Sequence, residues 1–129
     1  MKIIDIKTQD IRFPTSKDNL GTDAVHVDCD YSATYVTIFT DQKDLTGIGL
    51  TFTIGKGNDL CCTVIEYFKE FIIGKNVEEI EKDIASIWEK ITNHSQLRWV
   101  GPQKGVTHLA AAAFFNACLL YTSDAADDP

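Results

Sequence analysis

The fold is decided by the stretch GIGLTFTIGKGND, residues 47–59. Apolar side chains at Ile48, Leu50, Phe52 and Ile54 alternate with glycine and threonine, which is typical of a β-strand with one buried face. We therefore expect these four side chains to point toward the core. The glycines that follow the strand predict a turn, and beyond them the apolar spacing changes from two residues to that of a helix.

Two more strands are predicted on the N-terminal side. YSATYVTIFTD (31–41) is rich in β-branched and aromatic residues, and a short turn joins it to the first stretch as a hairpin. KIIDIKTQDIRF (2–13) alternates but changes parity, which predicts a bulge near Gln9 and Asp10. Together the three strands would form a small antiparallel sheet with one face to be covered.

Helices are predicted to supply that cover, over residues 58–73, 77–92 and 104–120. Asn58 is expected to cap the first helix, and Asn76 with Glu79 has the spacing of a capping box for the second. The third is rich in alanine, which would let another element approach closely. Strands followed by helices indicate an α+β domain, here a three-stranded antiparallel sheet followed by a three-helix layer.

The composition excludes several classes of protein. The chain has 129 residues, is 44% hydrophobic and 24% charged, and carries a net charge of −7, which suits one globular domain. Because basic residues are not clustered, neither nucleic acid nor a membrane surface is expected as a partner. The sequence has no signal-peptide core and no apolar run near the roughly 18 residues of a membrane span, so we expect a cytoplasmic location.

The cysteines leave two interpretations open. They are Cys29, Cys61, Cys62 and Cys118, and they form no C-x-x-C pair, which is typical of a reduced compartment. Either they are buried structural thiols, or Cys61 or Cys62 joins a histidine in a zinc site. Because the spacing matches no zinc pattern, we favour structural thiols and expect no metal ligand in the chain.

A long polar loop is the best candidate for a binding site. Residues 15–30 concentrate Asp, Asn, Thr and His side chains that can hydrogen-bond a polyhydroxylated ligand. On composition alone, a binding loop and a solvent-exposed loop are equally open. The sequence contains no phosphate-binding glycine loop and no nucleophile elbow, and the acidic residues near Glu78 suit the start of a helix. We therefore expect no catalytic residue.

Four blocks of the sequence resemble the N-terminal part of L-fuconate dehydratases, from the mandelate-racemase-like branch of the enolase superfamily. They are DIRFPTS (10–16), GTDAVHVDCDYSATYV (21–36), GLTFTIGKGND (49–59) and SQLRWVGPQKGVTHLAAAAFFNA (95–117). The resemblance implies an N-terminal capping domain that precedes a (β/α)-barrel, and the barrel is absent from this chain. The stripe at Val106, Leu109, Ala113 and Phe114 is then expected to be exposed.

The resemblance also implies a reaction for the intact enzyme, a hydro-lyase that converts L-fuconate to 2-keto-3-deoxy-L-fuconate. A barrel base removes the proton next to the carboxylate, Mg²⁺ stabilises the enediolate, and the 3-hydroxyl leaves as water. None of these groups maps onto this chain, which is expected to be inactive alone. The implied partners are the sugar acid and the missing barrel, and a homo-oligomer stays open.

Capping-domain loops help to choose the substrate in this superfamily, so the resemblance also implies substrate contacts. The candidate substrate-binding residues of the first loop are Gly21, Thr22, Asp23 and Tyr31. Asp23 and Tyr31 have side chains that can hydrogen-bond sugar hydroxyls. The second loop maps near Thr53 and Lys56.

The last residues depart from the family pattern. CLLYTSDAADDP, residues 118–129, resembles the in-frame translation of a sequencing adapter, and the other interpretation is a natural acidic tail. We expect a domain over 1–117 and a non-native tail over 118–129, with the last helix continuing to about Tyr121. The alternative to an enzyme fragment is a stand-alone binding or interaction module that uses the polar loop.

Overall fold

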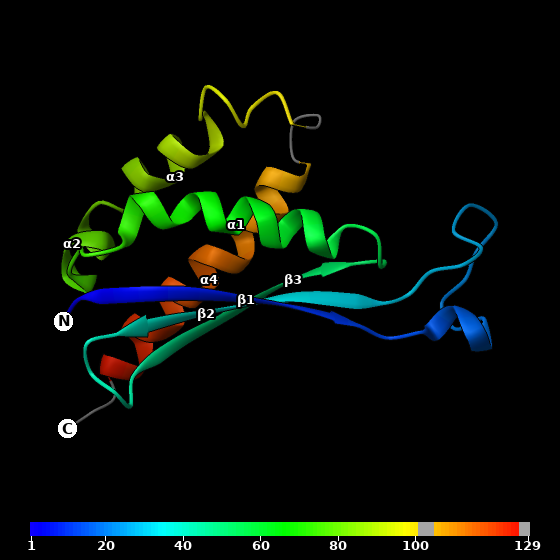
Figure 1. Cartoon of the computed structure of the whole chain (residues 1–129), viewed down its shortest axis with the longest axis horizontal. Coiled ribbons are helices and arrows are strands. Elements are labelled where there is room, and N and C mark those ends of the chain that lie inside the picture. The colour runs from blue at the N-terminus through cyan, green and yellow to red at the C-terminus, as the bar shows by residue number, and fades with distance from the viewer. Residues whose placement is uncertain (101–104, 127–129) are drawn as a thin grey trace.

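The computed structural model describes residues 1–100 and 105–126, with side chains described as far as residue 120. Its elements are β1 (Ile3–Arg12), the 3-10 helix η1 (Thr15–Asp18), β2 (Ser32–Thr40), β3 (Thr46–Thr53), α1 (Asn58–Ile72), α2 (Val77–Lys82), α3 (Ile84–Thr92) and α4 (Val106–Ala126). The predicted α+β order, strands first and helices after them, is confirmed (Figure 1).

The sheet has the order β1-β2-β3 with both pairs antiparallel, as predicted. The irregularity in β1 is not near Gln9 and Asp10, because the register shifts between Ile3 and Asp5. Ile3 and Ile6 are three residues apart and both buried, which regular alternation does not allow. The irregularity near Ile3 turns both side chains toward the core.

The prediction of which face of β3 points into the core is wrong. Ile48, Leu50, Phe52 and Ile54 have exposed fractions of 48, 45, 54 and 44%, whereas Gly47, Gly49, Thr51 and Thr53 are buried toward the helices. The strand alternates as expected, but alternation alone does not say which of its two faces lies inside.

Helix α4 explains this reversal. A Cβ atom on Gly49 would lie 2.0 Å from the carbonyl oxygen of Ala113 and 2.6 Å from the backbone nitrogen of Ala117. Both alanines are fully buried, so the helix presents small side chains to the glycine-rich face of β3. Two faces of small residues approach closely, and this packing outweighs the burial of the larger side chains on the other face of β3.

The helical layer follows the prediction in part. α1 matches, and Glu79 accepts a hydrogen bond from the Asn76 backbone at 3.2 Å in the expected capping box. The second predicted helix is divided at Asp83 into α2 and α3, and Ile80 of the first part and Ile87 of the second are both buried in the core. α4 continues past Tyr121 to Ala126, and the expected start at residue 104 lies outside the described residues, as do the last three residues of the chain.

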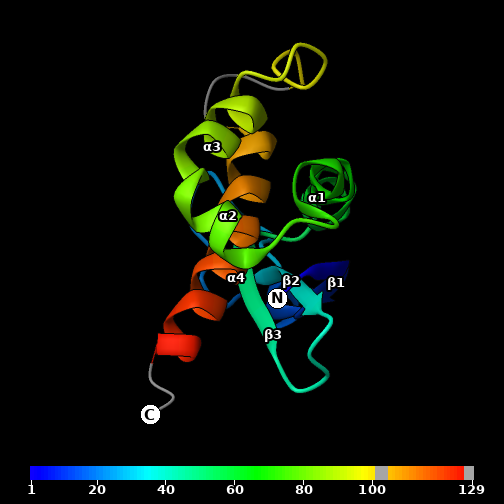
Figure 2. The same ribbon diagram turned by 90° about the vertical axis from the view of Figure 1, so that its left-hand side faces the viewer.

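The core lies between the sheet and helices α1 and α4, with α2 and α3 on the outer side of α4 (Figure 2). Phe68 and Phe114 meet edge to face at 5.5 Å between ring centroids. The stripe on α4 is therefore not exposed as expected, since Ala113 and Phe114 are fully buried and only Leu109, at 40%, reaches the surface substantially. No helix in the described part of the chain is long and apolar enough to cross a membrane.

Candidate capping site

Two loops meet at one end of the sheet. The first runs from the end of β1 to the start of β2 and projects beyond the sheet, and the second is the short turn between β3 and α1 (Figure 1). They contact each other where the Asp30 backbone N–H donates to the Ile54 carbonyl at 3.2 Å. A hollow of about 730 Å³ lies between them, with polar groups from Arg12, Ser16, His26, Asp28, Asp30 and Lys56 in its lining.

The base of the first loop is closed by side-chain hydrogen bonds. The Thr15 hydroxyl donates to the Cys29 carbonyl at 2.9 Å and accepts from the Tyr31 backbone N–H at 2.9 Å. Asp30 Oδ1 accepts from the Ser16 hydroxyl at 2.7 Å and from the Ser16 backbone N–H at 3.1 Å. These two donors, the hydroxyl first, hold the pKa of Asp30 below its usual value. The loop is therefore a closed Ω-loop with a fixed base.

Two of the predicted substrate-binding residues are paired with each other. The Tyr31 hydroxyl donates to the Gly21 carbonyl at 2.9 Å. Gly21 has φ +71°, and a Cβ atom there would lie 2.1 Å from the Tyr31 hydroxyl oxygen, so the contact requires glycine. The Tyr31 ring also packs edge to face on Phe52 at 5.5 Å, which joins the first loop to β3.

The other two predicted residues also bond within the loop. Thr22 donates to the Asn19 carbonyl at 3.1 Å. Asp23 Oδ1 accepts from the backbone N–H groups of His26 at 2.7 Å and Val25 at 2.8 Å, and its Oδ2 lies 3.2 Å from His26 Nδ1. The His26 backbone N–H first, and then that of Val25, lowers the pKa of the Asp23 carboxyl. Asp23 therefore fixes the turn that carries His26 to the hollow.

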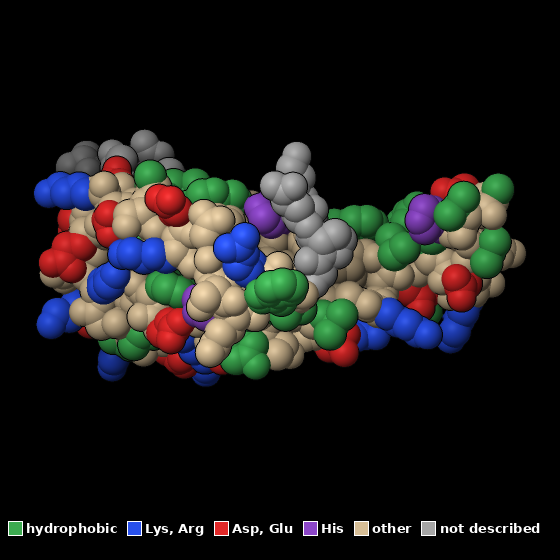
Figure 3. All heavy atoms as spheres, turned by 90° about the horizontal axis from the view of Figure 1, so that it is seen from above, with side chains coloured by type: hydrophobic (Ala, Val, Ile, Leu, Met, Phe, Trp, Pro, Cys, Tyr) green, Lys and Arg blue, Asp and Glu red, His purple; other side chains and the backbone are tan. Residues whose placement is uncertain are grey.

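The structure places the predicted residues beside the hollow rather than in it. Among the described residues that line the hollow, none is Gly21, Thr22, Asp23 or Tyr31, whereas Thr53 and Lys56 of the second loop do line it. Sequence reasoning did not single out Arg12 and Ser16, although both fall inside the DIRFPTS block that carries the resemblance. The first loop also exposes apolar side chains, with Val25 at 81% and Val27 at 65%. Figure 3 shows hydrophobic side chains on the surface of the projecting end of the molecule.

The described residues offer no cluster of three or more His, Cys, Asp or Glu side chains that could hold a metal ion. Cys61 is fully buried, and desolvation raises the pKa of its thiol to about 11, while that of Cys118 is raised to about 12. Protonated, buried thiols are poor ligands and poor nucleophiles. Cys61 and Cys118 therefore lie in environments typical of structural thiols.

Known proteins share both the sequence and the fold, although no family profile matches the chain. Mitochondrial enolase superfamily member 1 from Xenopus laevis is 46% identical over 117 residues, which is 90% of this chain and 26% of that protein. L-galactonate dehydratase from Hypocrea jecorina is 44% identical over 115 residues, 89% of this chain and 25% of that protein. The chain thus spans about a quarter of the length of the curated relatives it matches.

Solved structures show the same fold as this chain. The crystal structure of human mitochondrial enolase superfamily member 1 superposes with a TM-score of 0.90 at 40% identity, over 99% of this chain and 29% of that one. L-talarate dehydratase from Polaromonas sp. JS666, complexed with Mg and L-glucarate, shares the fold with a TM-score of 0.68 at 17% identity, over 97% of this chain and 30% of that one.

The three-stranded sheet, its helical layer and the two loops at one end therefore match the fold of the N-terminal capping domain in enolase-superfamily proteins. Within that superfamily, the matched relatives carry the names mitochondrial enolase superfamily member 1 and L-galactonate dehydratase. The similarity is thus to sugar-acid dehydratases and their relatives, and it is not specific to L-fuconate dehydratases.

Proposed function

We propose that this chain is the capping domain of a sugar-acid dehydratase, and that its two loops close over a sugar acid held at a barrel. The observation that carries the proposal is the hollow of about 730 Å³ between the loops, which is lined by charged and hydroxyl side chains from both. Sugar acids combine one carboxylate with several hydroxyls, and such groups are bound by cations, carboxylates and hydroxyls that converge on one space. The name of the fungal relative, L-galactonate dehydratase, supports the same class of substrate.

Within this proposal, the second loop meets the negative end of the substrate. Lys56 is exposed at the rim of the hollow, and His26 faces the same space from the first loop. Either group can donate to a carboxylate or a hydroxyl, while Asp28 and Asp30 can accept from hydroxyls. The role of the chain is to orient the substrate and to exclude water from it.

We propose L-fuconate as the substrate and 2-keto-3-deoxy-L-fuconate as the product. L-fuconate is 6-deoxy-L-galactonate, so the two sugar acids differ by one hydroxyl on the terminal carbon. Val25 lies in the lining of the hollow and is strongly exposed, which would offer an apolar contact to a methyl group at that position. A methyl group bound on an apolar surface is favoured over a hydroxymethyl group by a modest factor.

The described residues do not fit a magnesium site, because no three carboxylates among them come together. The base that takes the α-proton and the ligands that hold Mg²⁺ would therefore be contributed by the barrel of a longer protein. No chemical step is assigned to this chain, and we expect the chain alone to be inactive.

A chimera tests the proposal. Residues 1–117, the proposed domain, would be fused in frame to the remaining C-terminal part of human mitochondrial enolase superfamily member 1, whose corresponding region superposes with a TM-score of 0.90. Formation of a 2-keto acid from L-fuconate or L-galactonate with Mg²⁺ is expected from the chimera and not from the 129-residue chain. A chimera that folds but dehydrates neither sugar acid would refute the function, and tight binding of a sugar acid by the bare chain would favour a stand-alone binding module.

A further inference from the structure

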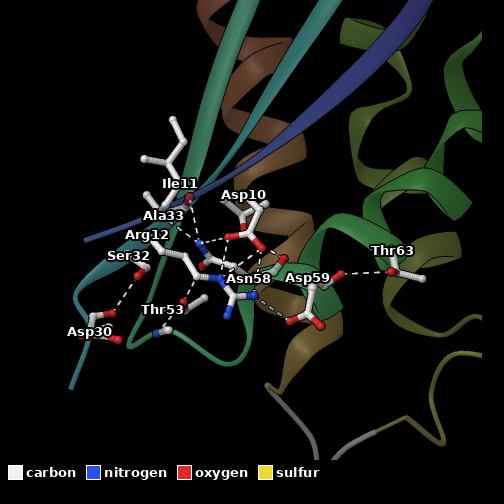
Figure 4. Close-up of polar contacts among 12 residues, drawn as sticks. Asp10, Ile11, Arg12, Asp30, Ser32, Ala33, Thr53, Asn58, Asp59 and Thr63 are labelled. Atoms are coloured by element: carbon white, nitrogen blue, oxygen red, sulfur yellow. Dashed lines mark hydrogen bonds and ion pairs between the residues drawn. The ribbon is translucent and has the colours of Figure 1, made fainter. Parts of the chain in front are cut away.

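Asn58 is a fully buried polar side chain at the start of α1. It does not cap the helix as the sequence predicts, because Gly57 occupies the N-cap position and the Asn58 side chain turns toward the end of the sheet (Figure 4). Burying an amide is costly unless its hydrogen-bonding groups are satisfied. The partners of Asn58 therefore show what the side chain holds in place.

Those partners come from all three strands. Asn58 Nδ2 donates to the Ile11 carbonyl of β1 at 3.1 Å, to the Ala33 carbonyl of β2 at 3.1 Å and to Asp10 Oδ1 at 2.9 Å. Its Oδ1 accepts from the hydroxyl of Thr53, the last residue of β3. One side chain thus ties the three strand ends together just before they enter the two loops (Figure 4).

The hydrogen bonds continue from Asn58 into both sides of the hollow. On the second loop, the Thr53 hydroxyl also accepts from the Gly55 backbone N–H at 3.2 Å. On the side of the first loop, Asp10 holds Arg12 through its Nη2 at 2.8 Å, and Arg12 reaches Asp59 at 3.3 Å. Arg12, Thr53 and Gly55 all line the hollow, so the network connects Asn58 to its walls.

We infer that Asn58 is a positioning residue that sets the separation of the two capping loops and so the shape of the site that receives the sugar acid. The inference rests on the proposed function for its substrate, and on the hydrogen bonds alone for the coupling of the loops. Asn58 acts through Thr53 and Asp10 and does not itself line the hollow. Removal of the Asn58 side chain should increase the mobility of the two loops more than it lowers the stability of the core.

Thr34 provides a matched control. It is also fully buried on the middle strand β2, and its hydroxyl donates to the Asn58 carbonyl at 3.1 Å, but it does not belong to the lining of the hollow. Thr34→Val removes a buried hydrogen bond from the same residue while leaving the Asn58 side chain and its partners in place. The Thr34→Val variant therefore measures the loss of core stability without the loss of the hydrogen bonds that hold the loops.

Amide hydrogen exchange on the 129-residue chain tests the coupling. In Asn58→Ala, the exchange rates of the Asp30 and Gly55 amides should rise by about tenfold relative to that of the Phe68 amide in α1. Without the Asn58 side chain, the hydrogen bond of each loop amide is weakened by roughly the free energy of one hydrogen bond. Thr34→Val should leave that ratio unchanged. Equal changes of the ratio in the two variants would overturn the inference.

Two further experiments test the same inference. If Asn58→Ala does not fold, Thr53→Val removes the hydroxyl that bonds both Asn58 Oδ1 and the Gly55 N–H. Exchange at Asp30, whose amide does not bond Thr53, should then accelerate relative to Phe68, and an unchanged ratio would overturn the inference. In the chimera, Asn58→Ala should raise KM for the sugar acid by about tenfold with kcat little changed, whereas a purely structural role would lower the amount of active enzyme and leave KM as it is. A chimera that is inactive with Asn58 intact counts against the proposed function, and the exchange ratios still decide the coupling.

Discussion

Gly49 shows how one residue sets the distance between two layers. The backbone of α4 lies where a side chain at this position would stand, so the strand and the helix meet with no atom between them. The same type of constraint occurs at Gly21, where the Tyr31 hydroxyl fills the space of a Cβ atom. At Gly49 the neighbour is helix backbone that cannot move aside, whereas at Gly21 it is the end of the Tyr31 side chain, and the φ of +71° adds the preference for glycine.

Gly49→Ala should lower the free energy of unfolding by about 2–3 kcal/mol, because the new methyl group meets backbone atoms that cannot move aside cheaply. Gly57→Ala is the control, since its Cβ would meet only Thr53, at ordinary contacts of 3.6 and 3.7 Å, and φ is −147° there. That change should cost no more than about 1 kcal/mol, from the loss of a favoured N-cap residue. Urea denaturation of both variants checks the difference, and equal costs would show that α4 does not approach β3 this closely.

The hydrogen bonds of Asp30 predict a dependence on pH. Its carboxyl has a pKa below the ordinary 3.8, so it stabilises the folded chain above that pH, and the contribution is lost as pH falls through the lowered value. Ser16→Ala removes the hydroxyl donor and should raise the pKa of Asp30 toward its ordinary value. A carbon-detected NMR titration of the Asp30 carboxyl measures this, and an unchanged midpoint would mean that Ser16 does not donate to it in solution.

Among the elements, β3 is the one whose environment was predicted least well. The hairpin with β2 and the addition of β1 follow from alternation and turn residues, and both are confirmed. The choice of face could not be predicted from the strand, because it depends on the alanines of α4 far along the chain. The break at Asp83 could not be predicted either, because residues 77–92 contain no glycine or proline that would mark the end of a helix.

The candidate site was predicted in outline. The long polar loop and the second loop near Lys56 do form the hollow. The sequence did not reveal that Asp23 and Tyr31 form their hydrogen bonds within the loop. These pairings depend on how the backbone turns between the donor and the acceptor residue. Asparagine before a helix predicts a cap, whereas the partners of the Asn58 side chain come from residues 10, 11, 33 and 53, which are distant in the sequence.

The reversal of β3 leaves an apolar sheet face exposed. Its most exposed members are Ile48, Leu50 and Phe52. Leu50→Thr should change the free energy of unfolding by less than about 1 kcal/mol and reduce self-association, because an exposed apolar patch becomes smaller. Val36→Thr, at a fully buried position on the other face of the sheet, should cost about 1–3 kcal/mol by burying a hydroxyl.

Denaturation and light scattering on the two variants test this assignment. If Leu50→Thr costs as much as Val36→Thr, the face that carries Leu50 is covered in solution, and the burial assigned to β3 is wrong.

At the scale of the whole molecule, the helices lie on one face of the sheet and the two loops on one end. The core lies between the sheet and helices α1 and α4 (Figures 1 and 2). The hollow lies at the loop end of the sheet, where Arg12, Phe52 and Thr53 join the loop residues in its lining. A capping domain can therefore vary its loops without disturbing its core. The network around Asn58 lies at the boundary between the two regions.

In the proposed function the first loop helps to bind the sugar acid, and kcat/KM of the chimera carrying Asp23→Ala measures that contribution directly. Loss of this carboxylate releases the turn that presents His26, so kcat/KM should fall by about 10- to 100-fold, the effect of one or two lost substrate hydrogen bonds. Asp18→Ala, in the exposed 3-10 helix of the same loop, should change it by less than about threefold. If the chimera with Asp23→Ala keeps its full kcat/KM, the first loop does not contribute to the site and the account is contradicted.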